Sequence, residues 1–531
     1  MNNYIKHSDT NEIEHEYSKF TTIEHRKKYA QFFTPFSLAD LMAKWLIGNK
    51  DLKTVLDPAF GLGVFSRALL NHNHNLKIIG FEIDENIYEK AKIIFKNNKN
   101  ISINLSDFMH NDWDNNYDGI ICNPPYFNFR NYDSKNILEE IGKRISFKLN
   151  GLTNLYTLFL LKSIYQLNEN GRAAFIIPSE FLNSDFGKLI KSYLIKSKTL
   201  RHIAVINFKE NVFNDALTTS AIILCANDNK SGKVQFSNVS SQNDFSNIER
   251  VIKSYPDYLS NERTVEFNNL NPELKWRAYY QEQNAVKYKN LVPFGNYGKV
   301  LRGIATGSNE FFTFNLSKAN KFGIANKYLL PCICKSIDSK NSFFTNDDFE
   351  KLQANDKTVY LLNAVNPDKF VKRYIACGEE QEINQKYLTE KRNPWYSIEN
   401  RPPSPIWVSV FNRTGLRFVR NEANISNLTT FHCIYLNMFS APKTDLFFAY
   451  LLTDVSKQIF NDNRREYGKG LQKFEPNDIN NSKMLNLELL TSDSESEILE
   501  YFSLYRNSVI EKKPDESFVN NINDIFIKYY T

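Results

Sequence analysis

The chain has 531 residues, of which 42% are hydrophobic and 14% aromatic. At roughly 100 to 200 residues per domain, this length predicts two or three hydrophobic cores and excludes a small peptide-like scaffold. The apolar content also excludes a largely disordered chain. Lysine and arginine total 66 against 60 aspartate and glutamate, so the net charge of +6 suits a polyanionic partner without requiring one.

The sequence does not support a membrane-spanning or secreted protein. The longest apolar runs, such as 446–452, fall far short of the ~20 residues that a spanning helix needs. The first ten residues are polar and unlike a secretion signal. The six cysteines are scattered, without a repeated pair or a zinc-type histidine spacing. We therefore expect reduced, buried thiols, no metal site and a cytoplasmic protein.

The first 226 residues alternate short apolar runs with helical patterns. The apolar runs predict buried strands at 78–83, 119–122, 173–177, 203–207 and 220–225. The helical patterns lie at 38–47, 64–70, 85–95 and 155–167. Strand and helix in turn predict an α/β fold with a mostly parallel sheet covered on both faces, which binds ligands at the carboxyl ends of its strands.

The character of the sequence changes after residue 226. Polar residues crowd 227–247, and we predict a linker at 227–248 between a first domain, 1–226, and a second domain, 249–531. Turn residues, scattered aromatics and many basic residues predict an irregular α+β fold for the second domain. Its last stretch, 492–530, is predicted to be helical.

Carboxylates follow predicted strands at three successive places. Asp57 opens a turn in which Gly61 and Gly63 would let a ligand approach the backbone closely. Glu82, about twenty residues further on, stands where nucleotide-binding sheets place an acceptor for ribose hydroxyls. Asp107 and Phe108 pair an acceptor with a ring that could pack on adenine. Each carboxylate taken alone could have a purely structural role, such as capping a helix, but together they predict a site for one nucleoside-like cofactor.

The stretch 117–126 carries a predicted strand into Asn123-Pro124-Pro125-Tyr126. Two successive prolines fix φ, so this corner is stiff and can hold an acceptor carbonyl in place. The four residues resemble the N-P-P-Y motif of methyltransferases that use S-adenosylmethionine and methylate a planar amino or amide nitrogen.

The order of the motifs resembles the gamma class of N6-adenine DNA methyltransferases, of which the TaqI-like restriction-modification enzymes are typical. The similar segments are 32–39, 57–65, Glu82, 107–108, 123–126, 154–156, 170–178 and 212–225. Two looser matches, 303–312 and 468–476, resemble segments of the target-recognition regions of these enzymes. Phe60 and Leu62 depart from the family, which usually has cysteine and a small polar residue there.

The resemblance implies a Rossmann-like S-adenosylmethionine-dependent methyltransferase domain followed by a DNA target-recognition domain. The activity implied is methyl transfer from S-adenosylmethionine to N6 of a flipped-out adenine in double-stranded DNA. Asn123 and the Pro124 carbonyl would accept the amino hydrogens, and Tyr126 and Phe213 would pack on the base. The cofactor-binding residues implied are Phe33, Thr34, Asp57, Ala59, Gly61, Gly63, Glu82, Ile83, Asp107, Phe108 and Asn123.

DNA recognition is expected in the second domain. The basic residues that suit phosphates and base edges are Arg413, Arg417, Arg464, Arg465 and Lys469. The alternative for most of them is a solvated surface. The expected partners are double-stranded DNA and a separately encoded restriction endonuclease, and we expect a monomer.

Other functions stay open at this point. The same motif occurs in methyltransferases of protein glutamine or RNA guanine, and N4-cytosine enzymes more commonly have serine in place of Asn123. A nuclease would need a magnesium site, for which Pro256-Asp257 and Glu273-Leu274-Lys275 fit a short, unspecific pattern. A catalytically inactive DNA-binding module is disfavoured by the intact N-P-P-Y motif.

Overall fold

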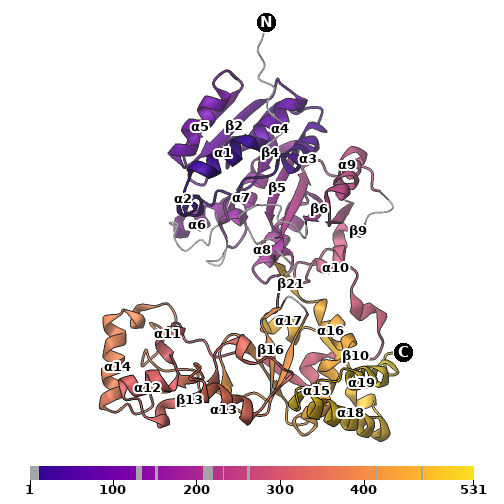
Figure 1. Cartoon of the computed structure of the whole chain (residues 1–531). Coiled ribbons are helices and arrows are strands. Elements are labelled where there is room, and N and C mark those ends of the chain that lie inside the picture. The colour runs from indigo at the N-terminus through magenta and orange to yellow at the C-terminus, as the bar shows by residue number, and fades with distance from the viewer. Residues whose placement is uncertain are drawn as a thin grey trace. The chain divides into compact units, whose positions relative to one another are not determined.

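The computed structural model describes residues 11–126, 134–149, 154–206, 219–230, 232–259, 263–412, 415–467 and 471–531. The chain divides into two compact units (Figure 1). Unit 1 comprises residues 1–282 and 466–470, and unit 2 comprises 283–465 and 471–531.

Within the described residues, unit 1 is built on a nine-stranded sheet with the order β3-β2-β1-β4-β5-β7-β6-β8-β9. Its strands are β1 (Thr54–Asp57), β2 (Lys77–Glu82), β3 (Ile101–Leu105), β4 (Tyr117–Cys122), β5 (Leu167–Pro178), β6 (Leu200–Ile206), β7 (Ser220–Ala226), β8 (Lys233–Val239) and β9 (Arg263–Glu266). Strands β1 to β5 pair in parallel, and β7 lies antiparallel between β5 and β6. Because the chain runs outward from β1 to β3 and then returns to β4, the strand order switches between β1 and β4.

Helices cover both faces of this sheet. Residues 173, 175 and 177 of β5 belong to one core and residues 174 and 176 to the other, as the two-residue period of a strand requires. One core contains α3 (Phe36–Ile47), α4 (Val64–His72), α5 (Glu85–Phe95) and α9 (Phe245–Ser254). The opposite core contains α6 (Ser134–Arg144), α7 (Leu155–Tyr165), α8 (Gly187–Ser197) and α10 (Arg277–Tyr280). The predicted α/β fold, its strands and its helices are thus confirmed.

The predicted linker at 227–248 is wrong, because this segment continues the sheet. Strand β8 pairs in parallel with β6 and antiparallel with β9. Its polar composition suggested a linker, yet Gln235 and Ser237 are buried. The Ser237 hydroxyl is 2.8 Å from Nε2 of His202, and such internal partners allow a strand with polar residues to be buried.

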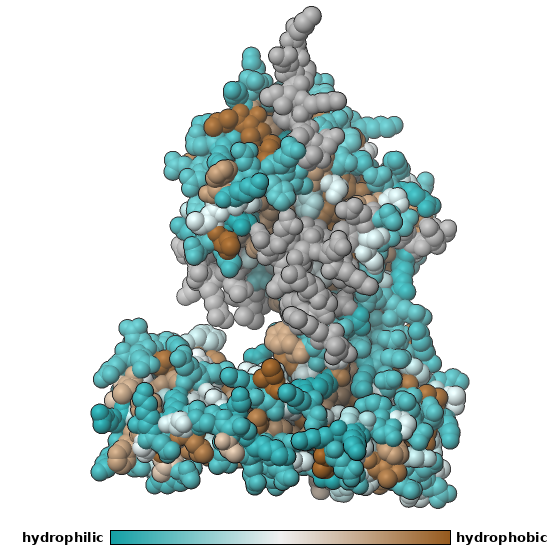
Figure 2. Space-filling view, viewed as in Figure 1, coloured by the Kyte–Doolittle hydropathy of each residue, from teal (hydrophilic) through white to brown (hydrophobic). Residues whose placement is uncertain are grey.

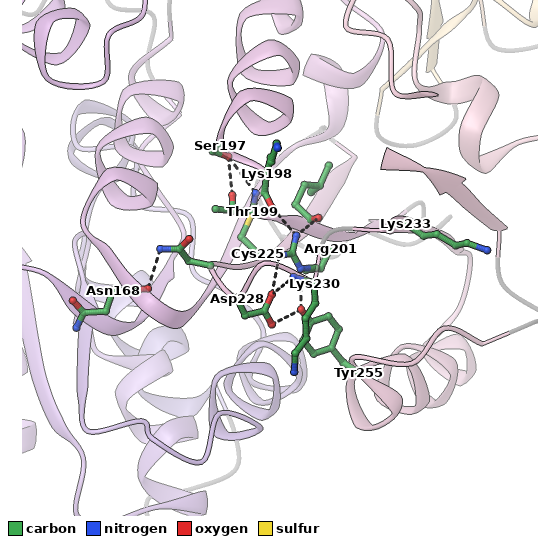
Figure 3. Close-up of polar contacts among 12 residues, drawn as sticks. Asn168, Ser197, Lys198, Thr199, Arg201, Cys225, Asp228, Lys230, Lys233 and Tyr255 are labelled. Carbon is green, nitrogen blue, oxygen red and sulfur yellow. Dashed lines mark hydrogen bonds and ion pairs between the residues drawn. The ribbon is translucent and has the colours of Figure 1, made fainter. Parts of the chain in front are cut away.

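A buried polar cluster ties the start of this extension to β6 (Figure 3). Arg201 donates from Nη2 to Asp228 Oδ1 and from Nε to the Tyr255 hydroxyl, both at 2.8 Å. The Tyr255 hydroxyl donates to the other oxygen of Asp228 at 2.5 Å. Only 1% of the Arg201 side chain and 11% of the Asp228 side chain are exposed. Asp228 and Tyr255 are therefore integral parts of unit 1.

Unit 2 is an irregular α+β region with separate hydrophobic cores, as predicted. In one core the sheet β11-β20-β16-β18-β14 packs against helices that include the predicted helical end of the chain. Its elements are β11 (Gly298–Arg302), β14 (Phe343–Phe344), β16 (Ile406–Ser409), β18 (Phe418–Asn421), β20 (Phe431–Leu436), α15 (Thr444–Leu452), α16 (Asp454–Asn461), α17 (Pro476–Asn480), α18 (Ser492–Ile510) and α19 (Ser517–Ile527).

A further core of unit 2 is formed by the sheet β12-β15-β13-β19 and the helices around it. Its elements are β12 (Thr313–Phe314), β13 (Leu329–Ile333), β15 (Tyr360–Leu362), β19 (Ser426–Asn427), α11 (Asn309–Phe312), α12 (Leu316–Phe322), α13 (Asn346–Ala354) and α14 (Lys369–Glu380). The short strand β10 (Leu291–Pro293) pairs with β23 (Lys483–Leu485), and β17 (Phe411–Asn412) pairs with β22 (Leu471–Lys473).

Hydrophilic residues cover most of the described surface on the face drawn in Figure 2, and hydrophobic residues occur there in small separate groups. Across the described residues, every helix is too short or too polar to cross a membrane.

Candidate active site

A cavity lies at the carboxyl ends of β1, β2, β3 and β4, where the strand order switches. Open α/β sheets bind their ligands at this position. Its wall comes from the segment before α3, from the loops after the four strands, from α7 and from α1 (Glu12–Phe20). The lining residues are Glu14, 29–34, 58–62, Val64, Phe65, 81–83, Ile87, 106–108, Asn123, Pro125, Leu155 and Phe159.

The turn between β1 and α4 brings some of the predicted glycine-loop residues to the cavity and leaves others behind it. Ala59 and Gly61 line the cavity, whereas Asp57 and Gly63 do not. Both glycines have positive φ, +54° and +73°. A Cβ on Gly61 would meet nothing within 4 Å, but a Cβ on Gly63 would lie 2.3 Å from the Phe95 ring. Gly63 is therefore required by packing, and Gly61 keeps the cavity wall open.

Asp57 is fully buried beneath this turn. Its Oδ1 accepts a hydrogen bond from the Ala59 N–H at 3.3 Å, which shapes the turn. Burial raises the pKa of Asp57 to about 8, and the nearby Glu82 adds to the shift.

Phe60, the departure from the family motif, is explained by β2. Its ring packs edge-on against Phe95 with the ring centroids 5.6 Å apart. A Cβ on Gly80 would lie 2.2 Å from the Phe60 ring. The missing side chain of Gly80 therefore makes the space that Phe60 fills.

Glu82 ends β2 with its carboxylate held by backbone donors. Oε2 accepts from the Gly61 N–H, and Oε1 accepts from the N–H groups of Ile83 and Asp84, each at 2.9 Å. Burial raises the pKa of Glu82, and these hydrogen bonds oppose the rise. A carboxylate has about four acceptor sites, so Oε2 keeps one for a ligand hydroxyl. Ile83, which is half exposed, lines the cavity beside it.

The loop after β3 contributes an acceptor and an aromatic wall. Asp107 Oδ1 accepts from the Met109 N–H at 2.8 Å, and this hydrogen bond fixes the start of the loop. The Phe108 ring is buried and packs on Phe159 of α7, with ring centroids 5.4 Å apart. Both predicted residues line the cavity.

Lys162 of α7 forms hydrogen bonds with the backbone of the same loop. Its buried ammonium group donates to the carbonyl oxygens of Phe108 and Asn111 and lies 4.0 Å from the centre of the Phe108 ring. Burial lowers the pKa of Lys162 to about 7. No sequence pattern indicates this role, because a lysine inside an apolar helix forms no recognisable motif.

The Asn123 amide is oriented by the segment before α3. Its Nδ2 donates to the Phe32 carbonyl at 2.8 Å and to the Thr34 hydroxyl at 3.0 Å. Both amide hydrogens are thus used, so Oδ1 alone is left for a substrate. Phe33 and Thr34, both predicted to bind the cofactor, line the cavity.

Tyr126 completes the corner without lining the cavity. Its hydroxyl donates to Asn123 Oδ1 at 2.6 Å, and the carbonyl oxygen of Ile176 is 3.1 Å away. Its ring stacks on Phe32, with centroids 5.9 Å apart and planes 18° apart, and meets Tyr156 edge-on. Burial raises the pKa of Tyr126 far above its usual value, so the phenol stays protonated.

Phe213, predicted as a second ring for the base, lies outside the described residues. Phe32 is an aromatic at this corner that the sequence reasoning missed, although the motif Phe32-Phe33-Thr34 was recognised. Pro124 is not part of the cavity wall, whereas Pro125 is.

Two of the predicted DNA-binding residues, Arg417 and Arg465, make contacts within unit 2. Arg417 donates to the carbonyl oxygens of Ser339 and Ser336. Arg465 forms a bidentate ion pair with Asp478, from Nε to Oδ2 at 2.9 Å and from Nη2 to Oδ1 at 3.1 Å.

Arg464 is half-buried, and its Nη1 is 3.4 Å from the Asn461 carbonyl oxygen. Arg413 and Lys469 lie outside the described residues.

The pattern considered for a nuclease does not form a metal site. Glu273 is exposed and pairs with Lys188 at 2.7 Å. Within the described parts of the chain, no group of three or more His, Cys, Asp or Glu side chains is placed to hold a metal ion.

An open sheet whose switch point holds acceptors for a nucleoside, beside a rigid Asn-Pro-Pro-Tyr corner, is the arrangement of S-adenosylmethionine-dependent N-methyltransferases. The cavity fits this cofactor, because Glu82 and Asp107 supply acceptors, Phe108 supplies an apolar wall, and Gly61 leaves open space.

Comparison with known proteins agrees with this assignment for both units of the chain. The family model described as N-6 DNA Methylase matches residues 14–262, and that of the C-terminal domain of the type II methyltransferase M.Eco57I matches 275–517. The chain is 61% identical to the type II methyltransferase M.AccI of Acinetobacter calcoaceticus, over 99% of this chain and 98% of that protein. It is 24% identical to M.HindII of Haemophilus influenzae over 81% of each chain.

The chain therefore belongs to the N6-adenine DNA methyltransferases of restriction-modification systems. It is an adenine-specific DNA methyltransferase that takes its methyl group from S-adenosylmethionine.

Solved structures agree at the level of the fold. The chain resembles a nuclease-deletion mutant of the type ISP restriction-modification enzyme LlaGI in complex with a DNA substrate mimic, with a TM-score of 0.53 and 12% identity. That match covers 90% of this chain but only 54% of the LlaGI chain. A DrdV–DNA complex is similar, with a TM-score of 0.50 and 13% identity over 92% of this chain and 59% of that one.

Proposed function

We propose that the protein is a gamma-class enzyme that methylates N6 of a flipped-out adenine at a specific site in double-stranded DNA. The observation that carries the proposal is the orientation of the Asn123 amide. Because its nitrogen is committed to Phe32 and Thr34, the corner presents an oxygen acceptor, as an amino-group substrate requires.

The Asn123 oxygen and the Pro124 carbonyl accept the two hydrogens of the adenine amino group. The lone pair of this nitrogen is otherwise delocalised into the ring, and the two hydrogen bonds favour the tetrahedral nitrogen that frees it. The bound cofactor supplies a methyl group activated by a sulfonium centre. The residues of the corner act by orientation and electrostatics, and a strong base is not needed.

Tyr126 links base binding to this corner. Its hydroxyl occupies one of the two lone pairs of Asn123 Oδ1, which leaves the other for the adenine amino group. Its ring, already parallel to Phe32, belongs to an aromatic site that offsets part of the few kcal/mol lost when a base leaves the duplex. Phe213 is proposed as a further ring at the base.

The cofactor is held along the edge of the sheet. Glu82 accepts from the ribose, Asp107 reads the adenine amino group, and Phe108 packs on the adenine ring. Phe33, Thr34, Ala59, Gly61 and Ile83 shape the cavity wall.

Asp57 and Gly63 act indirectly, because they shape the turn that carries Gly61.

The test is transfer of tritiated methyl groups from S-adenosylmethionine to unmethylated DNA, RNA and total protein, followed by nucleoside analysis. The proposal predicts label in N6-methyladenine of DNA. Asn123→Ala should lower the rate by about 100- to 1000-fold, the usual effect of removing one group that stabilises the reacting centre. Asn97→Ala, a change of an exposed residue in the turn that follows α5, serves as the matched control and should leave the rate unchanged.

Label found only in protein or RNA, or a rate unaffected by Asn123→Ala, would overturn the proposal. The first outcome would favour a protein-glutamine or RNA methyltransferase with the same N-P-P-Y chemistry.

We further propose that one chain acts alone on DNA in the cytoplasm, paired with a separately encoded restriction endonuclease. The cofactor cavity and the catalytic corner both belong to unit 1, which suits a monomer. Light scattering of the protein bound to its DNA site should give the mass of one chain, and the mass of two chains would refute a monomer.

A further inference from the structure

Helix α1 brings a carboxylate to the cavity that no sequence motif indicates. Glu14 and Tyr17, one helical turn apart, are the buried residues of this helix. Tyr17 packs with Leu62 of the β1–α4 turn and with Ile87, so α1 covers that turn. Glu14 lines the cavity.

Arg67 fixes this carboxylate in place. Its Nη2 donates to Glu14 Oε1, and the two side chains are 0% and 4% exposed. Arg67 lies in the first turn of α4, directly after the glycine turn. Glu14 therefore lies at the β1 end of the cavity.

The second oxygen of Glu14 has no donor from the protein. Oε2 is shielded from water, and the described residues offer it no hydrogen bond. A buried carboxylate oxygen without a donor is destabilising, and a ligand that brings an N–H group removes the deficit.

The order of the strands indicates which part of the cofactor meets Glu14. Along the edge β3-β2-β1, Asp107 is proposed to face adenine and Glu82 to face ribose. The amino-acid part of the cofactor then falls to the β1 end, and its α-ammonium group carries three N–H donors and a positive charge.

Asp57 is the other carboxylate at this end, and it is the poorer acceptor for a cation. It does not line the cavity, and burial raises its pKa to about 8, which favours the neutral acid at pH 7.

We infer that Glu14 accepts a hydrogen bond from the α-ammonium group of S-adenosylmethionine, so that the N-terminal helix contributes a cofactor-binding residue. This inference rests on the cofactor site proposed above for the same cavity.

Calorimetry with ligands that differ in the amino-acid part tests it. S-adenosylhomocysteine carries the ammonium group, an analogue with hydrogen in place of the α-amino group lacks it, and 5′-methylthioadenosine lacks the whole amino-acid part. Glu14→Gln should weaken binding of S-adenosylhomocysteine about 10- to 100-fold, the range for a hydrogen bond to a charged group. Binding of the other two ligands should change less than about twofold, since they make no such bond.

Glu16→Gln is the matched control, because it makes the same change at an exposed position of the same helix. It should leave all three affinities unchanged. Equal weakening of all three ligands by Glu14→Gln would show a purely structural role and overturn the inference, as would no weakening at all.

A crystal structure of the unaltered protein with S-adenosylhomocysteine gives a test without any variant. The ligand nitrogen is expected within hydrogen-bond distance, about 3 Å, of a Glu14 oxygen. A nitrogen bound elsewhere in the same cavity would overturn the role of Glu14 alone. Failure of the unaltered protein to bind either S-adenosylhomocysteine or 5′-methylthioadenosine would instead overturn the cofactor site and the inference together.

Discussion

The Asn123 amide shows how a single side chain acquires its function from residues far away in the chain. Its nitrogen donates to the Thr34 hydroxyl, 89 residues earlier in the sequence. The motif N-P-P-Y identified Asn123, but an isolated asparagine can present either its oxygen or its nitrogen. Only the contacts with Phe32 and Thr34 determine that the oxygen is presented.

Asp57 leads to a prediction about stability and pH. Its pKa is raised to about 8 in the folded protein, against about 3.9 in an unfolded chain. The unfolded state therefore loses this proton first, and the stabilisation present below about pH 4 is lost as the pH rises towards 8. Asp57→Asn removes this titration. Without cofactor, the melting temperature of Asp57→Asn relative to that of the unaltered protein should rise as the pH goes from 4 to 8. A difference that stays constant over this pH range would contradict a buried, protonated Asp57 carboxyl.

Arg464 and Arg465 are neighbours, and we predict that replacing them affects different properties: DNA binding for Arg464 and stability for Arg465. Arg465→Gln leaves Asp478, 1% exposed, without its guanidinium partner, so it should destabilise unit 2 by about 3 kcal/mol in denaturant unfolding. Arg464→Gln should lower the slope of log affinity for DNA against log salt by about one. An unchanged salt slope with Arg464→Gln would remove this residue from the DNA contacts.

At the scale of elements, the turn between β1 and α4 combines two glycines with different tasks. Positive φ at both positions costs an ordinary residue about 1–2 kcal/mol. Gly63→Ala also drives a Cβ into the Phe95 ring. The clash adds to the cost of positive φ, so this variant should lose more than about 2 kcal/mol of stability. Gly61→Ala adds a Cβ on the cavity wall, so it should lower cofactor affinity more than stability. Thermal melting and calorimetry of both variants check this, and equal effects of the two would contradict separate tasks.

Strand and helix periodicity predicted most elements of unit 1 but failed at β8. The apolar runs of β2, β4 and β7 are buried on both faces, so their composition alone marks them as strands. Strand β8 buries Gln235 and Ser237, and it is held in the sheet by pairing with β6 and by the contact between Ser237 and His202. A pattern of apolar residues cannot reveal a strand whose buried side chains are polar.

At the scale of the whole molecule, the boundary of unit 1 lies near residue 282 rather than 226. A fragment of residues 1–282 should unfold cooperatively and bind S-adenosylhomocysteine. A fragment of residues 1–226 should not, because it lacks β8 and α9 and leaves the buried Arg201 without Asp228 and Tyr255. Circular dichroism melting and calorimetry compare the two, and equal melting temperatures would refute the longer boundary.

The sequence by itself determined the fold class, and the resemblance of its motifs to a known family implied the cofactor, the reaction and the candidate site residues. These depend on short-range patterns: strand and helix periodicity, a glycine turn, and N-P-P-Y. Only the tertiary structure decided that Asp57 and Gly63 lie behind the cavity wall, that Asn123 presents its oxygen, that Lys162 binds the loop after β3, and that Glu14 lines the cavity. These features arise where segments distant in sequence bury polar groups against one another, and such pairings leave no periodic trace in the chain.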